Sequence, residues 1–493
     1  MKNQQKIKWR AIDYFRTISL FVLLTLIIVG LTFVALIVEV GGTGNRGDFL
    51  SGSKELSEKI YIILALAFVF ALTYIYFYTE MRDFLYKTSN IFMFFTVMTV
   101  SMAACWLFGK INPYLRPFAL CALLMLLLVG RRAALFLNCA FCICMLLLDL
   151  FVRTSPDYDR VIYTSLIINF ISGIFAVFMI DGEGSRAKVL GHSVFIAIPV
   201  IVSAVCLEFT TSVSELDAEG LRALGRTALF AFGSGVLSDG IMMLLLPFFE
   251  IAFGAVTNFR LAELTDHKAR LIKCLIALAP GTFNHTTIVA MLAEACSNAI
   301  GENPLLARAC AYYHDIGKIK KPEYFTENQT GVNPHDELSP ELSTEIIRSH
   351  AKDGAELIRK WRLPEVLADA AEQHHGTMPI RYFYAKALKY TDGELNMDNF
   401  CYAGPKPQTK INAIIMICDA CEAKVRSIGT RSHENVDKAV KEIIEERMDA
   451  EQFSDCDITF RELDIIRNTI TNSLAGVYHD RVKYPKLKSG SKK

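Results

Sequence analysis

The sequence predicts an all-α protein in which a polytopic helical membrane domain precedes an all-helical cytoplasmic domain. Three observations predict this fold class. The chain of 493 residues is 52% hydrophobic, its apolar residues concentrate before residue 257 and its charged residues after it, and few segments alternate as strands would. We therefore expect a transmembrane domain over 1–256, a soluble domain over 257–480 and a basic tail over 481–493.

A helix that crosses a bilayer needs about 20 mostly apolar residues. Eight segments approach this requirement, namely 17–39, 60–79, 89–109, 116–130, 132–151, 161–180, 190–208 and 227–255. The fourth segment is short and the eighth is long. The division between the fourth and the fifth rests on Gly130, Arg131 and Arg132, which leaves the count of eight open by one.

Basic residues near the N-terminus indicate its side of the membrane. Lys2, Lys6, Lys8, Arg10 and Arg16 precede or begin the first apolar segment, and positively charged flanks remain in the cytoplasm. An even number of spans then returns the second half of the chain to the cytoplasm. The net charge of +1 gives no electrostatic reason to expect a nucleic-acid polymer as partner, so the expected large partner is the lipid bilayer.

Asp239 lies inside the last apolar segment. A carboxylate within a membrane is costly and is a functional candidate by default. The alternative is that Asp239 packs against polar groups between helices, and the sequence favours neither explanation.

The second half of the chain contains sequence signals for the starts and ends of helices. Ser339 followed by Pro340 matches an N-cap with proline at the first helical position. A further short helix is expected over 364–375, closed by Gly376. These signals, with no convincing alternating strands, predict an all-helical second domain.

Seven histidines and aspartates in this half form an ordered set. They are His285, His314, Asp315, His350, His374, His375 and Asp419. Imidazole suits iron, manganese and zinc, while a carboxylate can bridge two ions. Two ions about 3.5–4 Å apart can share a hydroxide and clamp a phosphoryl group. The set therefore predicts a site for two divalent transition-metal ions, whereas the other five histidines are expected to be packed or surface residues.

Short stretches around these residues are specific as well. They are 279–285, 312–318, 333–336, 373–377 and 404–410. With them, residues 257–480 resemble the cytoplasmic domain of the seven-transmembrane-receptor HD hydrolases, the family that includes the membrane cyclic di-AMP phosphodiesterase. Members of this family often carry a large extracellular domain after the first span. This chain has only residues 41–58 in that place, so the resemblance gives no support for an extracellular sensor.

The resemblance implies both an activity and a set of ligands. The activity is hydrolysis of cyclic di-AMP to linear pApA in second-messenger signalling, at a bacterial cell membrane and with a cytoplasmic HD domain. The two divalent ions would be iron or manganese. One ion would be bound by His285, His314, Asp315 and Asp419. The other would be bound by His350, His374 and His375, with Asp315 bridging the two.

Lys318 and Asn333 are the expected contacts with substrate, and Lys318 joins Asp315 as a catalytic candidate. Lys318 begins a polar segment that reaches residue 339, and a long irregular loop in a compact domain is usually functional. Its ammonium could meet a phosphate as a point charge, although a solvated loop lysine is the alternative. Asn333 could read the edge of an adenine. The sequence leaves a homodimer open.

Three other functions remain as alternatives. A cyclic di-GMP phosphodiesterase of the HD-GYP type would continue after the paired histidines with a Gly-Tyr-Pro run, whereas residues 376–380 read Gly-Thr-Met-Pro-Ile. A phosphohydrolase of nucleotides has no need of eight spans. A non-enzymatic membrane receptor with the same fold should have lost some of the seven ligands.

Overall fold

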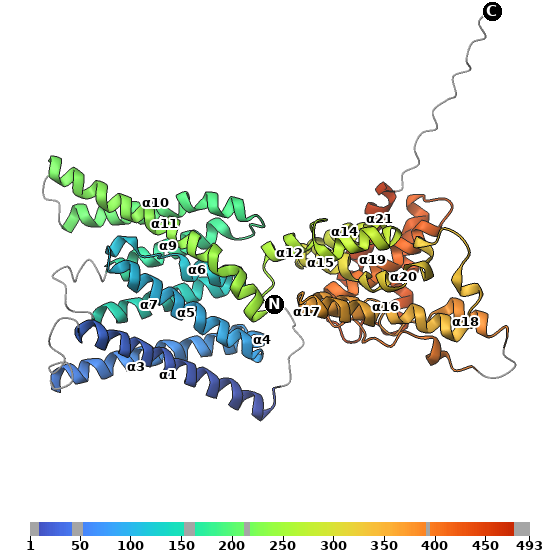
Figure 1. Cartoon of the computed structure of the whole chain (residues 1–493), viewed down its shortest axis with the longest axis horizontal. Helices are drawn as coiled ribbons and strands as arrows, with labels where there is room; N and C mark the ends of the chain where they lie inside the picture. The colour runs from blue at the N-terminus through green and yellow to red at the C-terminus, as the bar shows by residue number, and fades with distance from the viewer. Residues whose placement is uncertain (1–8, 42–52, 152–162, 212–216, 391–394, 478–493) are drawn as a thin grey trace, which may run out of the picture. The chain divides into compact units, whose positions relative to one another are not determined.

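The computed structural model describes residues 9–41, 53–151, 163–211, 217–390 and 395–477. Helices dominate these residues, and within them β-structure is limited to an isolated bridge between Pro379 and Cys401. The predicted all-α fold class is therefore confirmed. The chain divides into two compact units, of which the first ends at Arg260 and the second begins at Leu261 (Figure 1). The predicted domain limits at 256 and 480 remain predictions, and the tail 481–493 lies outside the described residues.

The first unit consists of apolar helices connected by short segments. Its helices are α1 (Ala11–Gly41), α3 (Ser53–Glu80), α4 (Arg82–Tyr86), α5 (Thr88–Gly109), α6 (Leu120–Leu128), α7 (Arg131–Phe151), α9 (Asn169–Ile180), α10 (Arg186–Thr211) and α11 (Ala218–Phe253). A 3₁₀ turn, η1 (Pro113–Leu115), precedes α6, and a π-helical turn, η2 (Thr164–Ile168), precedes α9.

Each of the eight predicted spans falls on an apolar helix. Among the described residues, 6 helices are long and apolar enough to cross a membrane, and two shorter apolar stretches cover Pro113–Leu128 and Thr164–Ile180. The predicted fourth span began at 116, but α6 occupies only Leu120–Leu128. Its start is displaced because Arg116 precedes Pro117 and has an extended ψ of 135°, as a residue before proline usually does.

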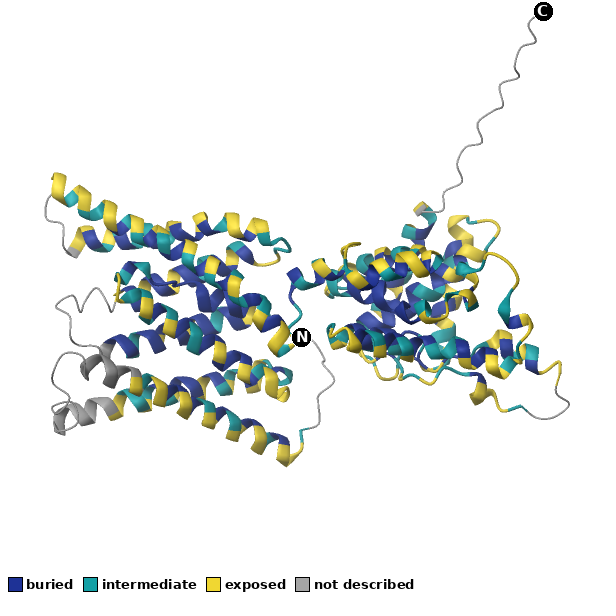
Figure 2. Ribbon diagram, in the orientation of Figure 1, coloured by how far each residue is buried: buried dark blue, intermediate teal, exposed yellow. Residues whose placement is uncertain are grey.

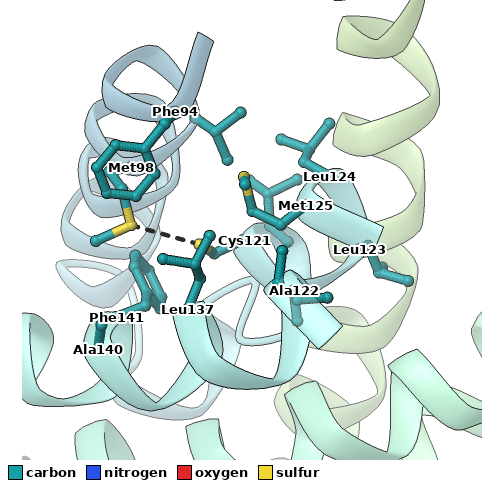
Figure 3. Packing of buried hydrophobic residues seen from close by; sticks show 14 of the residues in the cluster. Phe94, Met98, Cys121, Ala122, Leu123, Leu124, Met125, Leu137, Ala140 and Phe141 are labelled. Carbon is teal, nitrogen blue, oxygen red and sulfur yellow. Dashed lines mark hydrogen bonds between the residues drawn. The ribbon is translucent and has the colours of Figure 1, made fainter. Parts of the chain in front are cut away.

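The core of the membrane unit is built around α6. Every side chain from Leu120 to Met125 is fully buried, which is the pattern of a helix that is covered on all sides. Helices α5, α7, α9 and α11 pack against it. Figure 3 shows the packing, in which Cys121 Sγ lies 3.7 Å from Met98 Sδ beside Phe94 and Phe141. Large apolar side chains such as Leu64, Leu244 and Ile251 are exposed, as a lipid-facing surface requires. Figure 2 shows exposed residues recurring along the helices of this unit.

Buried polar groups also occur in the membrane unit. Arg116 forms an ion pair with Asp149, with 2.5 Å between Nη1 and Oδ2, and donates a hydrogen bond to Ser165. Asp239 on α11 is completely buried, and its two carboxylate oxygens have no hydrogen-bond partner among the residues that the structure describes. The part of the chain that the structure describes therefore offers no hydrogen bond to support a packing role for Asp239.

The second unit is a cluster of shorter helices. After α12 (Asn258–Leu264), which contains the division, come α13 (Arg270–Leu278), α14 (Pro280–Ala299), α15 (Pro304–Tyr313), α16 (Pro340–Lys360), α17 (Glu365–Gln373), α18 (Arg381–Ala387), α19 (Lys410–Ser427), α20 (His433–Asp449) and α21 (Phe460–Val477). Five 3₁₀ turns lie between them, namely η3 (Ile316–Lys320), η4 (Pro322–Tyr324), η5 (Thr326–Asn328), η6 (Pro334–Asp336) and η7 (Met397–Phe400).

Two sets of packed helices organise this unit. Helix α14 packs against α13, α15, α19 and α21, while α16 packs against α17, α18 and η3. The expected N-cap is confirmed, since Ser339 Oγ accepts a hydrogen bond from the Leu342 amide at 3.3 Å. Gly376 follows α17 with a positive φ of 52°, which agrees with its expected role at the helix end.

Candidate metal centre

Five segments bring the seven predicted ligands to one place. His285 lies on α14, His350 on α16 and Asp419 on α19, in each case within a helix. The two adjacent pairs lie at helix ends instead. His314 caps the C-terminus of α15 with Asp315 next to it, and His374 and His375 follow α17. At a helix end the backbone departs from helical geometry, so neighbouring side chains can converge.

Three of the histidines are oriented by main-chain carbonyl groups of their own helices. The Nδ1 atom of His314 lies 2.6 Å from the Ala311 carbonyl, that of His350 lies 2.5 Å from Ile347 and that of His374 lies 2.8 Å from Ala371. A carbonyl can only accept, so each Nδ1 carries the proton. Each Nε2 is then left with its lone pair, which is the form of imidazole that binds a metal.

Asp315 lies between the two groups of histidines. Its Oδ2 atom is 3.4 Å from His314 Nε2 and 3.9 Å from His285 Nε2. Its Oδ1 atom is 3.3 Å from His350 Nε2 and 3.6 Å from His374 Nε2. The two oxygens of one carboxylate thus face different histidine groups, as a bridging ligand must.

The side chains form two groups with metal-ligand spacing. One consists of Asp315, His350, His374 and His375, and the other of His285, His314 and Asp419, and within each group the donor atoms lie within 4.8 Å of one another. Asp419 also reaches across, because its Oδ1 lies 3.0 Å from His285 Nε2 and its Oδ2 lies 3.7 Å from His375 Nδ1. Two carboxylates therefore link the groups, whereas the resemblance implied only Asp315.

Glu422 is a further carboxylate of the site that the sequence analysis missed. Its Oε2 atom lies 2.5 Å from His285 Nδ1, and the residue is completely buried. A carboxylate on the second nitrogen of a ligating histidine fixes its orientation and raises its basicity. The signal in the sequence is its position, because Glu422 follows Asp419 by three residues and shares its helix face.

Burial and charge set the protonation of the cluster. Burial lowers the pKa of His314 to about 4 and also lowers the pKa values of His350 and His375, so these imidazoles are neutral at pH 7. Burial alone would raise the pKa of Asp315, but nearby Lys318 and His314 bring it well below its usual range.

His285 behaves differently from the other histidines. Burial lowers its pKa, but the hydrogen bonds with Asp419 and Glu422 outweigh that effect and raise the value to about 10. A metal ion at Nε2 would have to displace the proton beside Asp419, whereas the proton on Nδ1 would stay with Glu422. A second observation also supports a metal at this site. The buried atoms His314 Nε2 and Asp315 Oδ1 have no hydrogen-bond partner among the described residues.

Lys318 lies at the edge of the cluster. Its Nζ atom is 2.7 Å from Asp315 Oδ2 and 2.9 Å from Glu327 Oε1, and it lies 4.9 Å from the centre of the Phe325 ring. Burial works against the ammonium, but Asp315 and Glu327 raise the pKa of Lys318 above its ordinary value. The side chain is therefore charged and held in one place, unlike that of a solvated loop lysine.

A cleft of about 340 Å³ opens onto the cluster. Lys318, His350, His375 and Asp419 line it, together with Tyr402, whose ring stacks on His375 with 4.1 Å between the ring centres. Asn333 is not among the lining residues. Its Oδ1 atom accepts hydrogen bonds from Gln329 and from the His335 amide, and its contact with substrate remains a prediction.

The chain combines a unit of several apolar helices with a helical unit that contains a buried cluster of histidines and aspartates. These two features place it in the class of membrane proteins that carry a metal-binding domain. Two family models match the chain. The model described as "7TM receptor with intracellular HD hydrolase" matches residues 58–257, and the model described as "HD domain" matches residues 282–424. The chain belongs to this family of membrane HD hydrolases. An HD domain implies binding of divalent metal, and its match includes all seven candidate ligands.

Curated relatives carry a common name. The chain is 38% identical over 448 residues to the cyclic-di-AMP phosphodiesterase PgpH of Bacillus subtilis, a match that covers 88% of this chain and 61% of the relative. It is 41% identical over 316 residues to the Listeria monocytogenes protein of the same name, which covers 64% of this chain and 43% of that protein. The chain thus spans less than two thirds of the length of either relative.

One solved structure is that of the Listeria PgpH HD domain in complex with cyclic di-AMP. This chain is 48% identical to it, the match covers 43% of this chain and 99% of that one, and the TM-score is 0.42.

Proposed function

We propose that the chain is a membrane-anchored, metal-dependent phosphodiesterase that hydrolyses cyclic di-AMP to linear pApA. The observation that carries this proposal is the pair of metal-binding groups that meet at Asp315, with its two oxygens directed to different histidines. Seven ligands, of which Asp315 faces both groups, fit a dinuclear centre. The names of the Bacillus and Listeria relatives support cyclic di-AMP as the substrate.

The metal ions are proposed to be iron or manganese. Imidazole and carboxylate donors suit such ions, and the two groups include no thiolate. His285, His314 and Asp419 would hold one ion, His350, His374 and His375 the other, and Asp315 would bridge them. Two bound ions supply an activated water at neutral pH and stabilise the charge on a phosphoryl group.

The residues of the chain orient the substrate around this centre. Lys318 keeps Asp315 ionised and adds a fixed positive charge at the wall of the cleft, where a phosphate oxygen would gain a charge-assisted contact. The Tyr402 ring, stacked on His375, presents an aromatic surface to a base. Asn333 lies outside the cleft lining, and its contact with the edge of an adenine stays a prediction.

The proposed location is the bacterial cell membrane, with the HD unit in the cytoplasm, where it would meet an intracellular nucleotide. The apolar helices make the chain a membrane protein, and the lipid bilayer is accordingly its proposed partner. The orientation rests on the basic N-terminus and an even number of spans. A homodimer remains a prediction.

The test is a hydrolysis assay on the full chain purified in detergent and loaded with Mn²⁺ or Fe²⁺. We expect conversion of cyclic di-AMP to the linear dinucleotide with a higher kcat/KM than for cyclic di-GMP. If neither substrate is hydrolysed with Mn²⁺ or with Fe²⁺, the proposed enzymatic activity is refuted. A preference for cyclic di-GMP would refute the substrate and favour the HD-GYP type of chemistry, while leaving the metal centre in place.

A further inference from the structure

A second cleft adjoins the one above the metal centre. It has a volume of about 430 Å³ and is lined by Gly281, Asn284, Thr326, Glu327 and Arg426. Thr326, Glu327 and Arg426 also line the first cleft, so the two form one continuous depression. Only part of that depression is needed to place a single phosphodiester at the metals, which leaves a large space beside it without an assigned occupant.

One wall of the second cleft is formed by the first turn of α14 and by η5, which lie in close contact. A Cβ atom on Gly281 would lie 1.9 Å from the Glu327 carbonyl oxygen, so glycine is what permits this approach. Thr282 donates from Oγ1 to Glu327 Oε1 at 3.1 Å and accepts a hydrogen bond from Asn328 at 2.8 Å. The wall is therefore held by side-chain contacts on both sides rather than formed by a loose loop.

Arg426 provides a positive charge where the two clefts meet. It follows Asp419 by seven residues on α19, which places it about two helical turns, roughly 10 Å, further along the same face. Its side chain is 43% exposed, and the nearest carboxylate that pairs with it is Glu422, at 3.8 Å from Nη1. That distance is too long for a strong hydrogen bond, so most of the donors of the guanidinium remain available to a ligand.

Asn284 provides an amide in the lining of the same cleft. It precedes His285 on α14 and is exposed, and its side chain takes part in no hydrogen bond among the described residues. A free asparagine amide can donate to N7 and accept from the N6 amino group of adenine in a pair of hydrogen bonds, whereas guanine offers acceptors at both positions. Asn328, the other asparagine near this wall, is already bonded to Thr282.

We propose that the second cleft binds the half of a cyclic dinucleotide that is not cleaved, with Arg426 on the second phosphate and Asn284 on the second base. The inference rests on the proposed function, because it assumes that one phosphodiester of this substrate lies at the metals. A guanidinium binds phosphate in a bidentate manner. The cleft would thus give the enzyme affinity for a substrate with two phosphates and two bases over a simple phosphodiester.

The test of Arg426 compares two substrates on the full chain in detergent with Mn²⁺. We expect Arg426→Ala to raise KM for cyclic di-AMP about tenfold or more, since a charged hydrogen bond is lost, with little change in kcat. Hydrolysis of bis(p-nitrophenyl) phosphate, which has no second phosphate or base, should not change. Arg426→Lys should lie between the two, and Arg461→Ala, an exposed arginine outside both clefts, should behave as wild type.

Measurement of the bound metal distinguishes direct binding of the second phosphate by Arg426 from an indirect effect of Arg426 on the metal centre through Glu422. Equal losses on both substrates, or a fall in bound Mn²⁺ in Arg426→Ala, would show that Arg426 supports the metal centre and would overturn the proposal. Unchanged KM for cyclic di-AMP would overturn it as well. If the wild type hydrolyses bis(p-nitrophenyl) phosphate but no cyclic dinucleotide, the proposed function itself fails, which is a distinguishable result.

Asn284 is tested by the choice of base. Asn284→Ala should reduce the ratio of kcat/KM for cyclic di-AMP over cyclic di-GMP by about tenfold, because one bidentate contact to a base carries discrimination of that order. Its hydrolysis of bis(p-nitrophenyl) phosphate and its Mn²⁺ content should equal those of the wild type. An unchanged ratio would show that the second base is not read here.

Discussion

Asp315 has a position that no other side chain of the centre could replace. It is almost completely buried, each oxygen faces a different pair of histidines, and Lys318 holds its charge. Asp419 also touches both groups, but it approaches the second group only through His375. Removal of Asp315 would therefore separate the two groups more completely than removal of any single histidine.

We predict that Asp315→Ala abolishes hydrolysis of cyclic di-AMP. Asp315 is the residue that would hold both ions, so its loss would remove the activated water that a dinuclear centre would supply. Turnover and metal content should be measured together on the full chain, and Asp353→Ala provides a matched control, because Asp353 pairs with Lys320 on the surface of α16. Wild-type turnover by Asp315→Ala with an unchanged metal content would remove the residue from the proposed mechanism.

Glu422 supports the centre through His285, and we predict that Glu422→Ala weakens Mn²⁺ binding about 10- to 100-fold, the usual effect of losing such a partner. Glu422→Gln should recover part of the affinity, because its amide oxygen can still accept from His285 Nδ1. Titration of the metal-free chain with Mn²⁺ gives the affinity directly. Glu442→Ala, which removes a surface partner of Lys424, should bind metal as the wild type does.

The sequence predicted the metal ligands better than it predicted the residues that contact those ligands or the substrate. The ordered histidines and aspartates stand out because each is a donor in a specific local stretch, and the structure brings all seven together. Asn333 shows the limit, since an asparagine can cap a turn, as it does here, as readily as it can read a base, and the residue type alone does not distinguish the two. Tyr402 and His375 lie in different segments of the chain, so no local pattern in the sequence predicts their contact.

At the scale of elements, the centre depends on how closely η3 approaches α16. A Cβ atom on Gly317 would lie 2.0 Å from the His350 carbonyl oxygen and 2.6 Å from the Gly354 amide nitrogen. Two glycines therefore allow two backbones to touch. This approach brings Asp315, just before η3, within 3.3 Å of His350 on α16.

We predict that Gly317→Ala destabilises the soluble unit by about 1–3 kcal/mol, the usual cost of forcing extra volume into a packed site, and that it also lowers Mn²⁺ affinity. Thermal unfolding of the full chain in detergent, with and without metal, measures both effects. Gly331→Ala is the matched control, because a Cβ atom there meets nothing within 4 Å. Equal melting temperatures for the two variants would contradict the close approach.

Helix ends were the elements that composition predicted least well. Apolar composition located all eight segments of the membrane unit, but it extended the fourth to residue 116, where Pro117 forces an extended residue before the helix. Long apolar runs identify a helix reliably because burial dominates their energetics. The first and last turns depend on single residues whose effect is local.

At the scale of the whole molecule, the match of the seven-span family model agrees with the predicted segments. The matched range, 58–257, contains seven of the eight predicted spans, from 60–79 to 227–255. The first span, 17–39, precedes it. The predicted total of eight is even, and an even count would place both ends of the chain on the same side of the membrane.

The orientation leads to a prediction on which the proposed function also depends. We predict that a reporter inserted within residues 41–58 is external and that one fused after Lys493 is cytoplasmic, because the basic N-terminus stays inside and eight spans return the chain to that side. Alkaline phosphatase and green fluorescent protein report opposite locations, so each fusion controls the other. Substituting Lys2, Lys6 and Lys8 with glutamine should weaken the bias without changing the spans. A C-terminal fusion found outside would separate the HD unit from cytoplasmic cyclic di-AMP, and would refute both the topology and the substrate.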